Sequence, residues 1–305
     1  MRPDIEQVIQ LIQRRDSKSL EEALELLQKT VFSFSMKVCG QRQDAEDTMQ
    51  EVLLKSVPNL PKFDSPRALM VWLYKVAKNR CLMSRRKSKF APKKDLSLEE
   101  LMPDRQELQK LSGSPDGTPE TSLLHRENAK RLREAVQRLP AEYRLILVLH
   151  DMEELSDGDV AEITGLRPGT IRVRLHRARL FVRKELAKQE QQPMRRQAAK
   201  RAGEIHSLAL PRQRRCKEMF AELSNYLDDE LDDSLCEELE KHMDGCEPCK
   251  AFLSSLEKSI QQCRIAPNES SDPHIAARLR RELLFEYQSL MADIKKRDAI
   301  NIKPI

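Results

Sequence analysis

The sequence predicts an all-α protein made of several small helical domains, and three observations support this prediction. Apolar residues recur every three or four positions, the spacing of one face of an α-helix, as in ALELLQKTVFSFSMKV and DTMQEVLLKSV. Glycine is rare, with 8 residues in 305, and aromatic residues make up only 4%. Charged residues reach 34%, which favours small helical bundles over one large core.

Breaks in the helical pattern divide the chain into parts. The first predicted domain covers residues 1–90, where Ser65 before Pro66 suits the start of a helix through ALMVWLYKVAKNRCLMSRR. A flexible linker with the loop-forming segment SGSPDGTPE is expected over 91–122. The remaining predicted parts are a second helical domain (123–189), a basic linker (190–212), a small helical unit (213–262) and a tail with an amphipathic helix (263–305).

Charge is distributed unevenly along these parts. The net charge is +5, yet residues 75–94 hold nine basic side chains and no acidic one, whereas residues 216–249 hold twelve acidic side chains and two basic ones. The basic part predicts a nucleic-acid surface, and the acidic part predicts a segment that opposes it.

The sequence carries no signal for a membrane or for export. It has no apolar run of 18 residues, and its first ten residues, MRPDIEQVIQ, lack the apolar core of a signal peptide. We therefore expect a cytoplasmic protein. Its seven cysteines are not expected to form a disulfide framework in that compartment.

The stretch LSDGDVAEITGLRPGTIRVRLHRARLFVRKEL predicts a helix-turn-helix. Ser156 can cap a first helix, Gly165 supplies the left-handed turn position, and Pro168 suits the start of a second helix. A second helix of this kind fits the major groove of DNA with its first turn toward the bases. A solvated basic helix in an ordinary bundle is the alternative. The outer face is expected to carry Arg172, Arg174, His176, Arg177 and Arg179.

Two long stretches resemble one known family. The stretch LREAVQRLPAEYRLILVLHDMEELSDGDVAEITGLRPGTIRVRLHRARLFVRKEL resembles region 4 of bacterial sigma-70 family factors, most closely the short extracytoplasmic-function type. The stretch GQRQDAEDTMQEVLLKSVPNLPKFDSPRALMVWLYKVAKNRCLMSRRK resembles region 2 of that family, and the two occur in the family's order. The resemblance implies a non-enzymatic transcription initiation factor. Such a factor recruits core RNA polymerase and reads the −10 and −35 promoter elements.

The resemblance also assigns candidate residues. In the segment DAED…QE, those that bind core polymerase are Asp44, Asp47, Gln50 and Glu51. The DNA-binding candidates are Trp72, Lys75, Asn79, Arg80, Arg85 and Arg86 in region 2, and Arg167, Thr170, Arg172, Arg174 and Arg177 in region 4. From the residues alone, Trp72 is equally suited to core packing, and the acidic residues fit a plain solvated face.

The segment KHMDGCEPCK, residues 241–250, predicts part of a metal site. His242 and Cys246 lie about one helical turn apart, and the turn between them and Cys249 lets the second thiolate approach. Imidazole and thiolates at this spacing suit tetrahedral zinc. Cys216 and Cys236 are the two candidates for a fourth ligand, and buried reduced cysteines without metal are the alternative.

The stretch CKEMFAELSNYLDDELDDSLCEELEKHMDGCEPCKAFLSSL resembles the zinc-binding anti-sigma domain, whose pattern has a leading cysteine. The resemblance implies Cys216 as the fourth ligand and one zinc per chain. Asp229 stands where that family usually has glycine. Because anti-sigma domains hold a sigma factor away from polymerase, the resemblance implies contact of this domain with the sigma domains of its own chain. The alternative is a stabilising or partner-binding domain without inhibition.

Two rival functions explain single features only. An ordinary helix-turn-helix regulator accounts for residues 155–186 but not for the stretch that resembles region 2, and binding to core polymerase would distinguish the two. A zinc hydrolase is disfavoured because no glutamate stands in an H-E-x-x-H arrangement.

Overall fold

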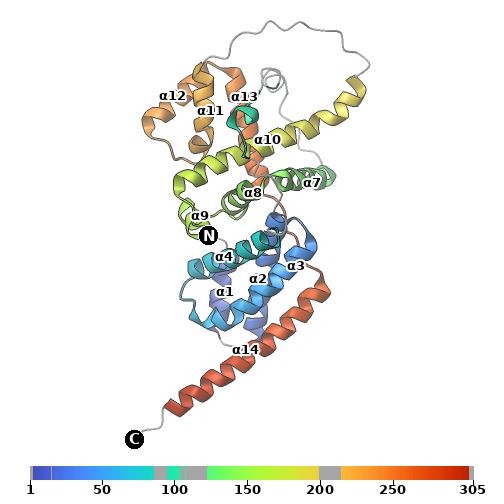
Figure 1. The fold of residues 1–305 in the computed structure, drawn as a ribbon, viewed down its shortest axis with the longest axis vertical. Coiled ribbons are helices and arrows are strands. Elements are labelled where there is room, and N and C mark those ends of the chain that lie inside the picture. Colours follow the sequence, from blue (N-terminus) through green and yellow to red (C-terminus); the bar gives the residue numbers. More distant parts are fainter. Residues whose placement is uncertain are drawn as a thin grey trace. The chain divides into compact units, whose positions relative to one another are not determined.

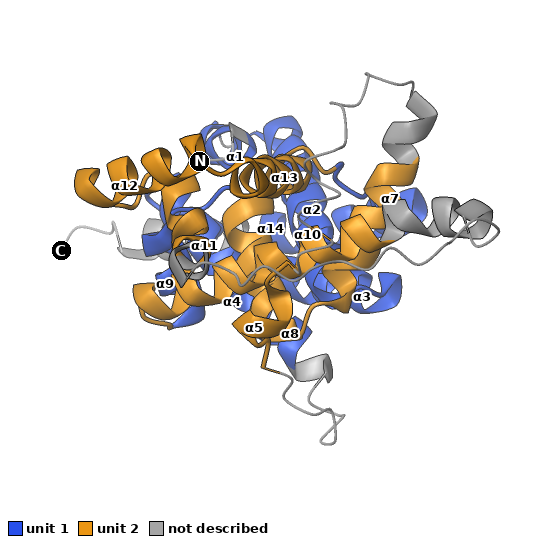
Figure 2. Ribbon diagram, turned by 90° about the horizontal axis from the view of Figure 1, so that it is seen from above, with its two compact units in different colours: residues 1–91, 153–165, 267–305 blue, residues 92–152, 166–266 orange. Residues whose placement is uncertain are grey.

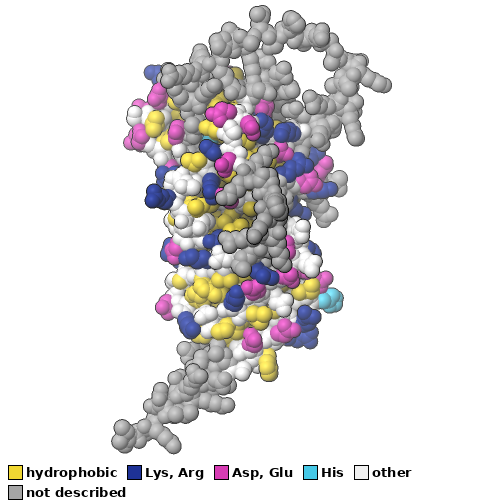
Figure 3. All heavy atoms as spheres, in the orientation of Figure 1, with side chains coloured by type: hydrophobic (Ala, Val, Ile, Leu, Met, Phe, Trp, Pro, Cys, Tyr) yellow, Lys and Arg dark blue, Asp and Glu magenta, His cyan; other side chains and the backbone are white. Residues whose placement is uncertain are grey.

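The computed structural model describes residues 3–14, 16–85, 95–103, 107, 122–198 and 214–301. Over these ranges every regular element is a helix, so the predicted all-α class is confirmed (Figure 1). No helix among the described residues is both long and apolar enough to cross a membrane. On the face seen in Figure 3, basic and acidic side chains are interspersed.

The chain forms two compact units, coloured separately in Figure 2. Unit 1 comprises residues 1–91, 153–165 and 267–305, and unit 2 comprises residues 92–152 and 166–266. The units therefore combine stretches from several of the predicted domains. The first helix of the predicted helix-turn-helix belongs to unit 1, and its second helix belongs to unit 2.

Unit 1 is a bundle around the long helix α2. Asp16 caps the start of α2 by accepting a hydrogen bond from the backbone N–H of Ser19 (2.8 Å), and Gly40 ends it in the left-handed conformation (φ 80°). Phe34 and Tyr74 meet edge to face in the core, with ring centroids 4.7 Å apart. The helices of unit 1 are α1 (Pro3–Gln13), α2 (Ser17–Cys39), α3 (Arg42–Ser56), η1 (Val57–Lys62), α4 (Pro66–Arg85), α9 (Asp157–Thr164) and α14 (Pro273–Asn301).

A disulfide joins two helices of unit 1. Cys39 of α2 and Cys81 of α4 are bonded, with their Cα atoms 5.5 Å apart. The sequence predicted no disulfide framework, and this single bond is a pairing that the prediction did not include. Packing of α2 against α4 brings together two side chains that lie 42 residues apart in the sequence.

Unit 2 is organised around the helix α10, which packs against α7, α8, α11 and α13. Phe220 and Phe252 meet edge to face between α11 and α13, with centroids 4.7 Å apart. In the predicted linker, Leu96, Leu101 and Met102 are buried, and α5 contacts α10. The helices of unit 2 are α5 (Leu98–Leu101), α7 (Ser122–Arg138), α8 (Ala141–Leu147), η2 (Val148–Met152), α10 (Pro168–Ala198), α11 (Arg214–Leu227), α12 (Asp233–Asp244) and α13 (Glu247–Arg264).

Candidate functional site

The local signals of the helix-turn-helix are present as predicted. The hydroxyl of Ser156 caps α9 by accepting a hydrogen bond from the backbone N–H of Asp159 (3.2 Å). Gly165 ends α9 with φ 74°, a conformation that L side chains rarely adopt. Pro168 then begins α10.

The predicted DNA-binding residues of this part lie at the start of α10. Arg167 and Thr170 are exposed, and Arg172, Arg174 and Arg177 are half-buried. The guanidinium of Arg174 is 2.8 Å from the carboxylate of Glu142.

One face of α10 carries four polar residues three or four positions apart, Arg172, His176, Arg179 and Arg183, which we call the polar stripe. Its first member, Arg172, is also one of the predicted DNA contacts. This face packs against α11 and α13, so His176, Arg179 and Arg183 are buried and Arg172 is half-buried. Arg172 pairs with Glu230, and the Nδ1 atom of His176 lies 2.8 Å from the hydroxyl of Ser224. The Nε atom of Arg183 donates to the hydroxyl of Ser255 (2.9 Å), and its guanidinium stacks over the ring of Phe252 (4.0 Å).

Arg179 is the most deeply buried residue of the polar stripe. Its side chain is 0% exposed and lies between two carboxylates, from Asp151 of η2 and Asp228 after α11. It donates two hydrogen bonds to Asp151 (2.7 and 2.9 Å) and two to Asp228 (2.6 and 2.8 Å). The expectation that Arg179 and His176 face outward is therefore wrong. Sequence reasoning also missed Asp151 and Asp228.

Electrostatics explain why this buried arrangement stays charged. Burial by itself raises the pKa of the Asp151 carboxyl, but the charge and hydrogen bonds of Arg179 outweigh burial and leave that pKa well below its usual range. Within the described ranges, the hydrogen-bond partner of the His176 ring is the neutral hydroxyl of Ser224 rather than a carboxylate. Burial, together with the positive charges of Arg179 and Arg177, lowers the pKa of His176 to about 4.

The predicted polymerase-binding residues lie on α3 in unit 1. Asp47 is exposed, and Asp44, Gln50 and Glu51 are half-buried. The Glu51 carboxylate is 2.7 Å from Lys55 Nζ and 2.9 Å from Arg80 Nε, so it joins this set to one of the predicted DNA contacts. A hydrogen bond from Lys55 lowers the pKa of Glu51.

The predicted DNA contacts of α4 differ in exposure. Lys75 and Asn79 are exposed, whereas Trp72 is half-buried with its ring centroid 5.7 Å from that of Phe63. Trp72 thus packs against a neighbour and still presents part of its ring. The side chain of Arg85 and the whole of Arg86 lie outside the described residues.

Three of the predicted metal ligands come together in unit 2. The donor atoms of His242, Cys246 and Cys249 all lie within 4.8 Å of one another. Two of these separations are 3.4 Å (His242 Nε2 to Cys249 Sγ) and 3.3 Å (between the two sulfurs). Zinc bonds of about 2.0–2.3 Å in a tetrahedron place ligand atoms roughly 3.3–3.8 Å apart, so the group fits zinc.

The structure gives different information on the two candidates for the fourth zinc ligand. Cys236 is not part of the group formed by His242, Cys246 and Cys249. Burial and the neighbouring carboxylate of Glu240 raise the pKa of the Cys236 thiol, which disfavours a metal-binding thiolate. Cys216 lies in the first turn of α11, but its side chain is outside the described residues.

The segment between α11 and α12 contains the residue that departs from the anti-sigma pattern. Asp229 has φ 55°, in the left-handed region where glycine is favoured and aspartate is tolerated. The backbone conformation thus explains why that pattern has glycine at this position.

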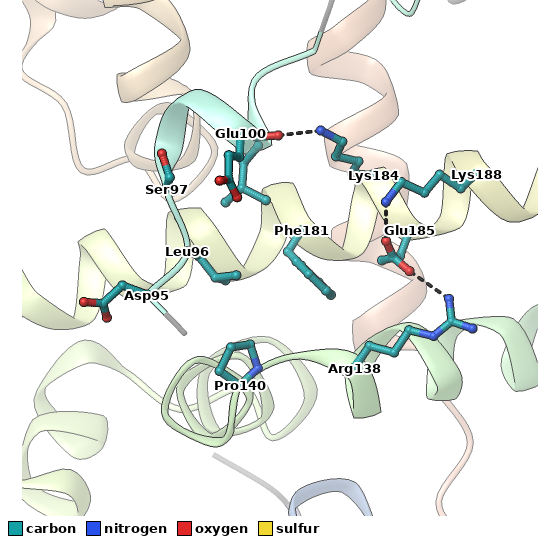
Figure 4. Close-up of a pocket in the computed structure, with 11 residues that line it drawn as sticks. Asp95, Leu96, Ser97, Glu100, Arg138, Pro140, Phe181, Lys184, Glu185 and Lys188 are labelled. Carbon is teal, nitrogen blue, oxygen red and sulfur yellow. Dashed lines mark hydrogen bonds and ion pairs between the residues drawn. The ribbon is translucent and has the colours of Figure 1, made fainter. Parts of the chain in front are cut away.

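Unit 2 also contains a cavity of about 570 Å³ where residues 95–101 lie against α10 (Figure 4). Glu185 on its wall pairs with Arg138 (2.8 Å) and Lys188 (2.7 Å). Burial raises the pKa of Glu185, but hydrogen bonds from Lys188 and Arg138 outweigh burial and lower it overall. The whole lining carries three acidic residues (Asp95, Glu100, Glu185) and three basic ones (Arg138, Lys184, Lys188), so its net charge favours neither an anionic nor a cationic ligand.

Comparison with family models matches three parts of the chain. Residues 23–90 match sigma-70 region 2, and residues 129–182 match sigma-70 region 4. Residues 216–250 match a family described as "Putative zinc-finger".

Known proteins with similar sequences include RNA polymerase sigma factors. The ECF RNA polymerase sigma factor SigW of Bacillus subtilis is 27% identical over 184 residues, covering 60% of this chain and 96% of SigW. The RNA polymerase sigma-H factor of Pseudomonas aeruginosa is 27% identical over 198 residues, covering 63% and 96%. A solved structure of the sigma factor RpoE with the anti-sigma factor NepR from Bartonella quintana aligns at 21% identity and a TM-score of 0.40, over 56% of this chain and 98% of that one.

Proposed function

We infer that this chain, which belongs to the sigma-70 family and carries its regions 2 and 4 followed by a zinc-finger domain, is a promoter-specific transcription initiation factor. The observation that carries this inference is the occurrence of both regions in one chain and in the family's order. A factor of this kind performs no reaction of its own. It acts in the cytoplasm, where RNA polymerase works.

We assign a separate task to each sigma region. Region 2 offers Asp44, Asp47, Gln50 and Glu51 on α3 to core polymerase. The basic and aromatic residues of α4 meet the −10 element, because a cationic surface with flat side chains suits splayed bases. Arg167, just before α10, and Thr170 and Arg172 in its first turns meet the −35 element in the major groove.

Binding to core polymerase tests this assignment. The purified full chain should form a complex with core polymerase at low salt and direct initiation at a promoter with −35 and −10 elements. Asp47→Lys should weaken that complex because it reverses an exposed charge on α3. Glu21→Lys makes the same charge change on the exposed side of α2 and should leave the complex intact. Failure of the unaltered chain to bind polymerase would exclude the function.

We propose further that the zinc-finger domain inhibits region 4 by covering the polar stripe of α10. Glu230 forms an ion pair with Arg172, one of the predicted DNA contacts. Asp228 forms an ion pair with the buried Arg179, which also pairs with Asp151. An acidic segment that engages these arginines competes with DNA phosphates for the same cations. The covalent connection makes this competition effective even if the contact is intrinsically weak.

In this proposal zinc holds the inhibitory domain together. His242 lies in the last turn of α12, Cys246 directly precedes α13 and Cys249 lies in its first turn, so one ion bound by all three fixes the angle between these helices. Cys216 would supply the fourth ligand from the first turn of α11. Because metal binding and folding are coupled in small zinc domains, loss of the metal should weaken the packing of this domain against α10.

Metal analysis should find one zinc per chain, and Cys246→Ser should lose most of it, because a site that keeps fewer thiolates binds zinc much more weakly. Cys236→Ser is the matched control and should retain full zinc. If Cys216→Ser retained full zinc and Cys236→Ser lost it, the assigned fourth ligand would be wrong.

Acid should weaken the contact between the zinc-finger domain and α10. The pKa of His176 is about 4 in the covered state against an ordinary value of 6.5, so uncovered His176 takes up a proton that the covered form does not. The contact is at full strength above pH 6.5 and weakens as pH falls toward 4. Between pH 7.5 and 5 the covering equilibrium should drop about 10- to 30-fold, since each pKa unit is tenfold.

Affinity for a −35 duplex, measured from pH 7.5 to 5 on the full chain, reports this release. His176→Gln keeps a polar side chain that does not titrate and should remove the extra gain in affinity at low pH. An identical pH profile for the variant and the unaltered chain would rule out His176 as the cause.

A further inference from the structure

Three stretches of unit 1 that are far apart in the sequence meet at one lysine. The Nζ atom of Lys37 in α2 lies 2.9 Å from Oε1 of Glu153 and 3.0 Å from Oδ1 of Asn268. Glu153 stands before α9 in the sequence, and Asn268 stands before α14. The Lys37 side chain is 10% exposed, and that of Glu153 is 0% exposed. Region 2 thus binds a segment of region 4 and the C-terminal tail through the same ammonium group.

Glu153 is held on both of its carboxylate oxygens. Tyr74 of α4 donates a hydrogen bond of 2.6 Å to Oε2, and the Lys37 ammonium group donates one to Oε1. A buried carboxylate is tolerated only when it is paired and hydrogen-bonded in this way. The next residue, Glu154, has φ 55°, a left-handed conformation that is unfavourable for a glutamate and indicates a constrained backbone at this contact.

The helix that follows, α9, lies along α4. Arg67 pairs with Asp159 (2.8 Å) and Glu162 (2.7 Å), and Lys78 Nζ donates to the backbone carbonyl of Ile163 (2.8 Å). The Arg67 pairs are exposed, and such pairs contribute little stability on their own. The buried contact of Glu153 is therefore the principal electrostatic support for α9 on region 2.

The C-terminal tail reaches the same lysine from a different stretch. Asn268 Oδ1 accepts a second hydrogen bond from the hydroxyl of Ser33 (2.7 Å). Beyond it, α14 buries Leu279, Leu283 and Tyr287, which recur every four residues on one face. Gln28 and Glu25 of α2 bind the same helix through the Ala276 carbonyl (2.9 Å) and Arg280 (2.7 Å).

We propose that Lys37 couples the C-terminal tail to α9, so that each segment strengthens the binding of the other to region 2. The Asn268 side chain orients the Lys37 ammonium group toward Glu153. The Glu153 carboxylate in turn neutralises the positive charge of that ammonium group, which the uncharged Asn268 cannot do. Losing either acceptor leaves a buried polar group with an incomplete set of partners, which weakens the remaining contact. Coupling of this kind is reciprocal by thermodynamic necessity.

The consequence for promoter binding rests on the proposed function. The helix α4 carries the predicted −10 contacts, and α9 is the first helix of the helix-turn-helix. While Lys37 binds both segments, α9 is retained on α4 and is not free to join the −35 element with the rest of region 4. A partner that pulls the tail away would thereby release α9 without touching region 4.

Amide hydrogen exchange of the full chain tests the coupling without polymerase or DNA. Lys37→Met should accelerate exchange at Val160 and Gly165 of the α9 segment and at Ala276 of α14, each by at least about tenfold. Ala45 in α3 should keep its protection and so report that region 2 is folded. Lys18→Met, an exposed lysine of the same helix, is the matched control and should change none of these amides.

A second variant separates coupling from simple loss of two contacts. Asn268→Ala removes only the tail's acceptor, and should still accelerate exchange at Val160 and Gly165 several-fold. Unchanged exchange in the α9 segment of this variant would overturn the proposal, even if α14 were released. If Lys37→Met also lost protection at Ala45, the Asn268→Ala result alone would decide. A chain that failed to initiate transcription would leave this readout intact, so the two ideas fail separately.

Discussion

Replacing Asp151 by alanine is expected to destabilise unit 2 by about 3–5 kcal/mol, because it removes one of the two carboxylates that each accept two hydrogen bonds from the buried guanidinium of Arg179. Arg179 is 0% exposed, and Asp228 then remains as its carboxylate partner in the described contacts. Urea unfolding of the full chain, followed by circular dichroism, should show an earlier transition for this unit.

Two comparisons make that experiment specific. Glu134→Ala removes an exposed carboxylate from α7 of the same unit and should change the unfolding free energy by less than about 0.5 kcal/mol. The pKa of Asp151 is depressed, so its contribution is complete above the ordinary value of 3.8 and is lost only as pH falls below it. The effect of Asp151→Ala should therefore be the same at pH 7.5 and pH 5. A loss below about 1 kcal/mol would show that the pair is not a determinant of stability.

A chain that ends at residue 198 should bind a −35 duplex at least tenfold more tightly than the full chain. It keeps all of α10 but removes Asp228, Glu230 and Ser224, which cover the polar stripe. Only residues 199–213 separate α10 from α11 in the sequence, and tethers of about this length give effective concentrations in the millimolar range. Removing the competitor should therefore have a large effect on apparent affinity.

A chain that ends at residue 266 separates the zinc-finger domain from the tail. It retains α11, α12 and α13 and should keep most of the inhibition of −35 binding. Binding should be compared at two salt concentrations, since the competing contact and the phosphate contacts are both screened. Equal affinity of the 198-residue chain and the full chain would contradict inhibition and leave the domain a stabilising role.

Local features of the fold were predictable from the sequence because they depend on a few neighbouring residues. Ser156, Gly165 and Pro168 mark the ends of α9 and the start of α10 by capping, left-handed geometry and a missing N–H. The grouping of His242 with Cys246 and Cys249 follows equally from their spacing. These parts of the candidate site needed no knowledge of tertiary packing.

The burial of α10 on more than one side could not be read from its sequence. Arginine and histidine on a helix face normally indicate solvent, and nothing near Arg179 indicates that Asp151 and Asp228 approach it. One sequence signal for this burial was available: polar residues recur every three or four positions along α10, at Arg172, His176, Arg179 and Arg183. This spacing defines one continuous helix face, and the chain also contains an acidic segment that such a face can bind. Lys37 and Glu153, 116 residues apart, left no such signal.

The assembly of unit 1 from separate stretches has a consequence for the newly made protein. Residues 1–91 leave the ribosome well before residues 267–305, with residues 92–266 translated in between. At about 5–20 residues per second this interval lasts roughly 10–35 s. During that time region 2 is complete while the tail that binds Lys37 has not been synthesised. Each nascent chain therefore passes through a stage in which this surface of α2 is exposed, before the tail that covers it in the finished molecule exists.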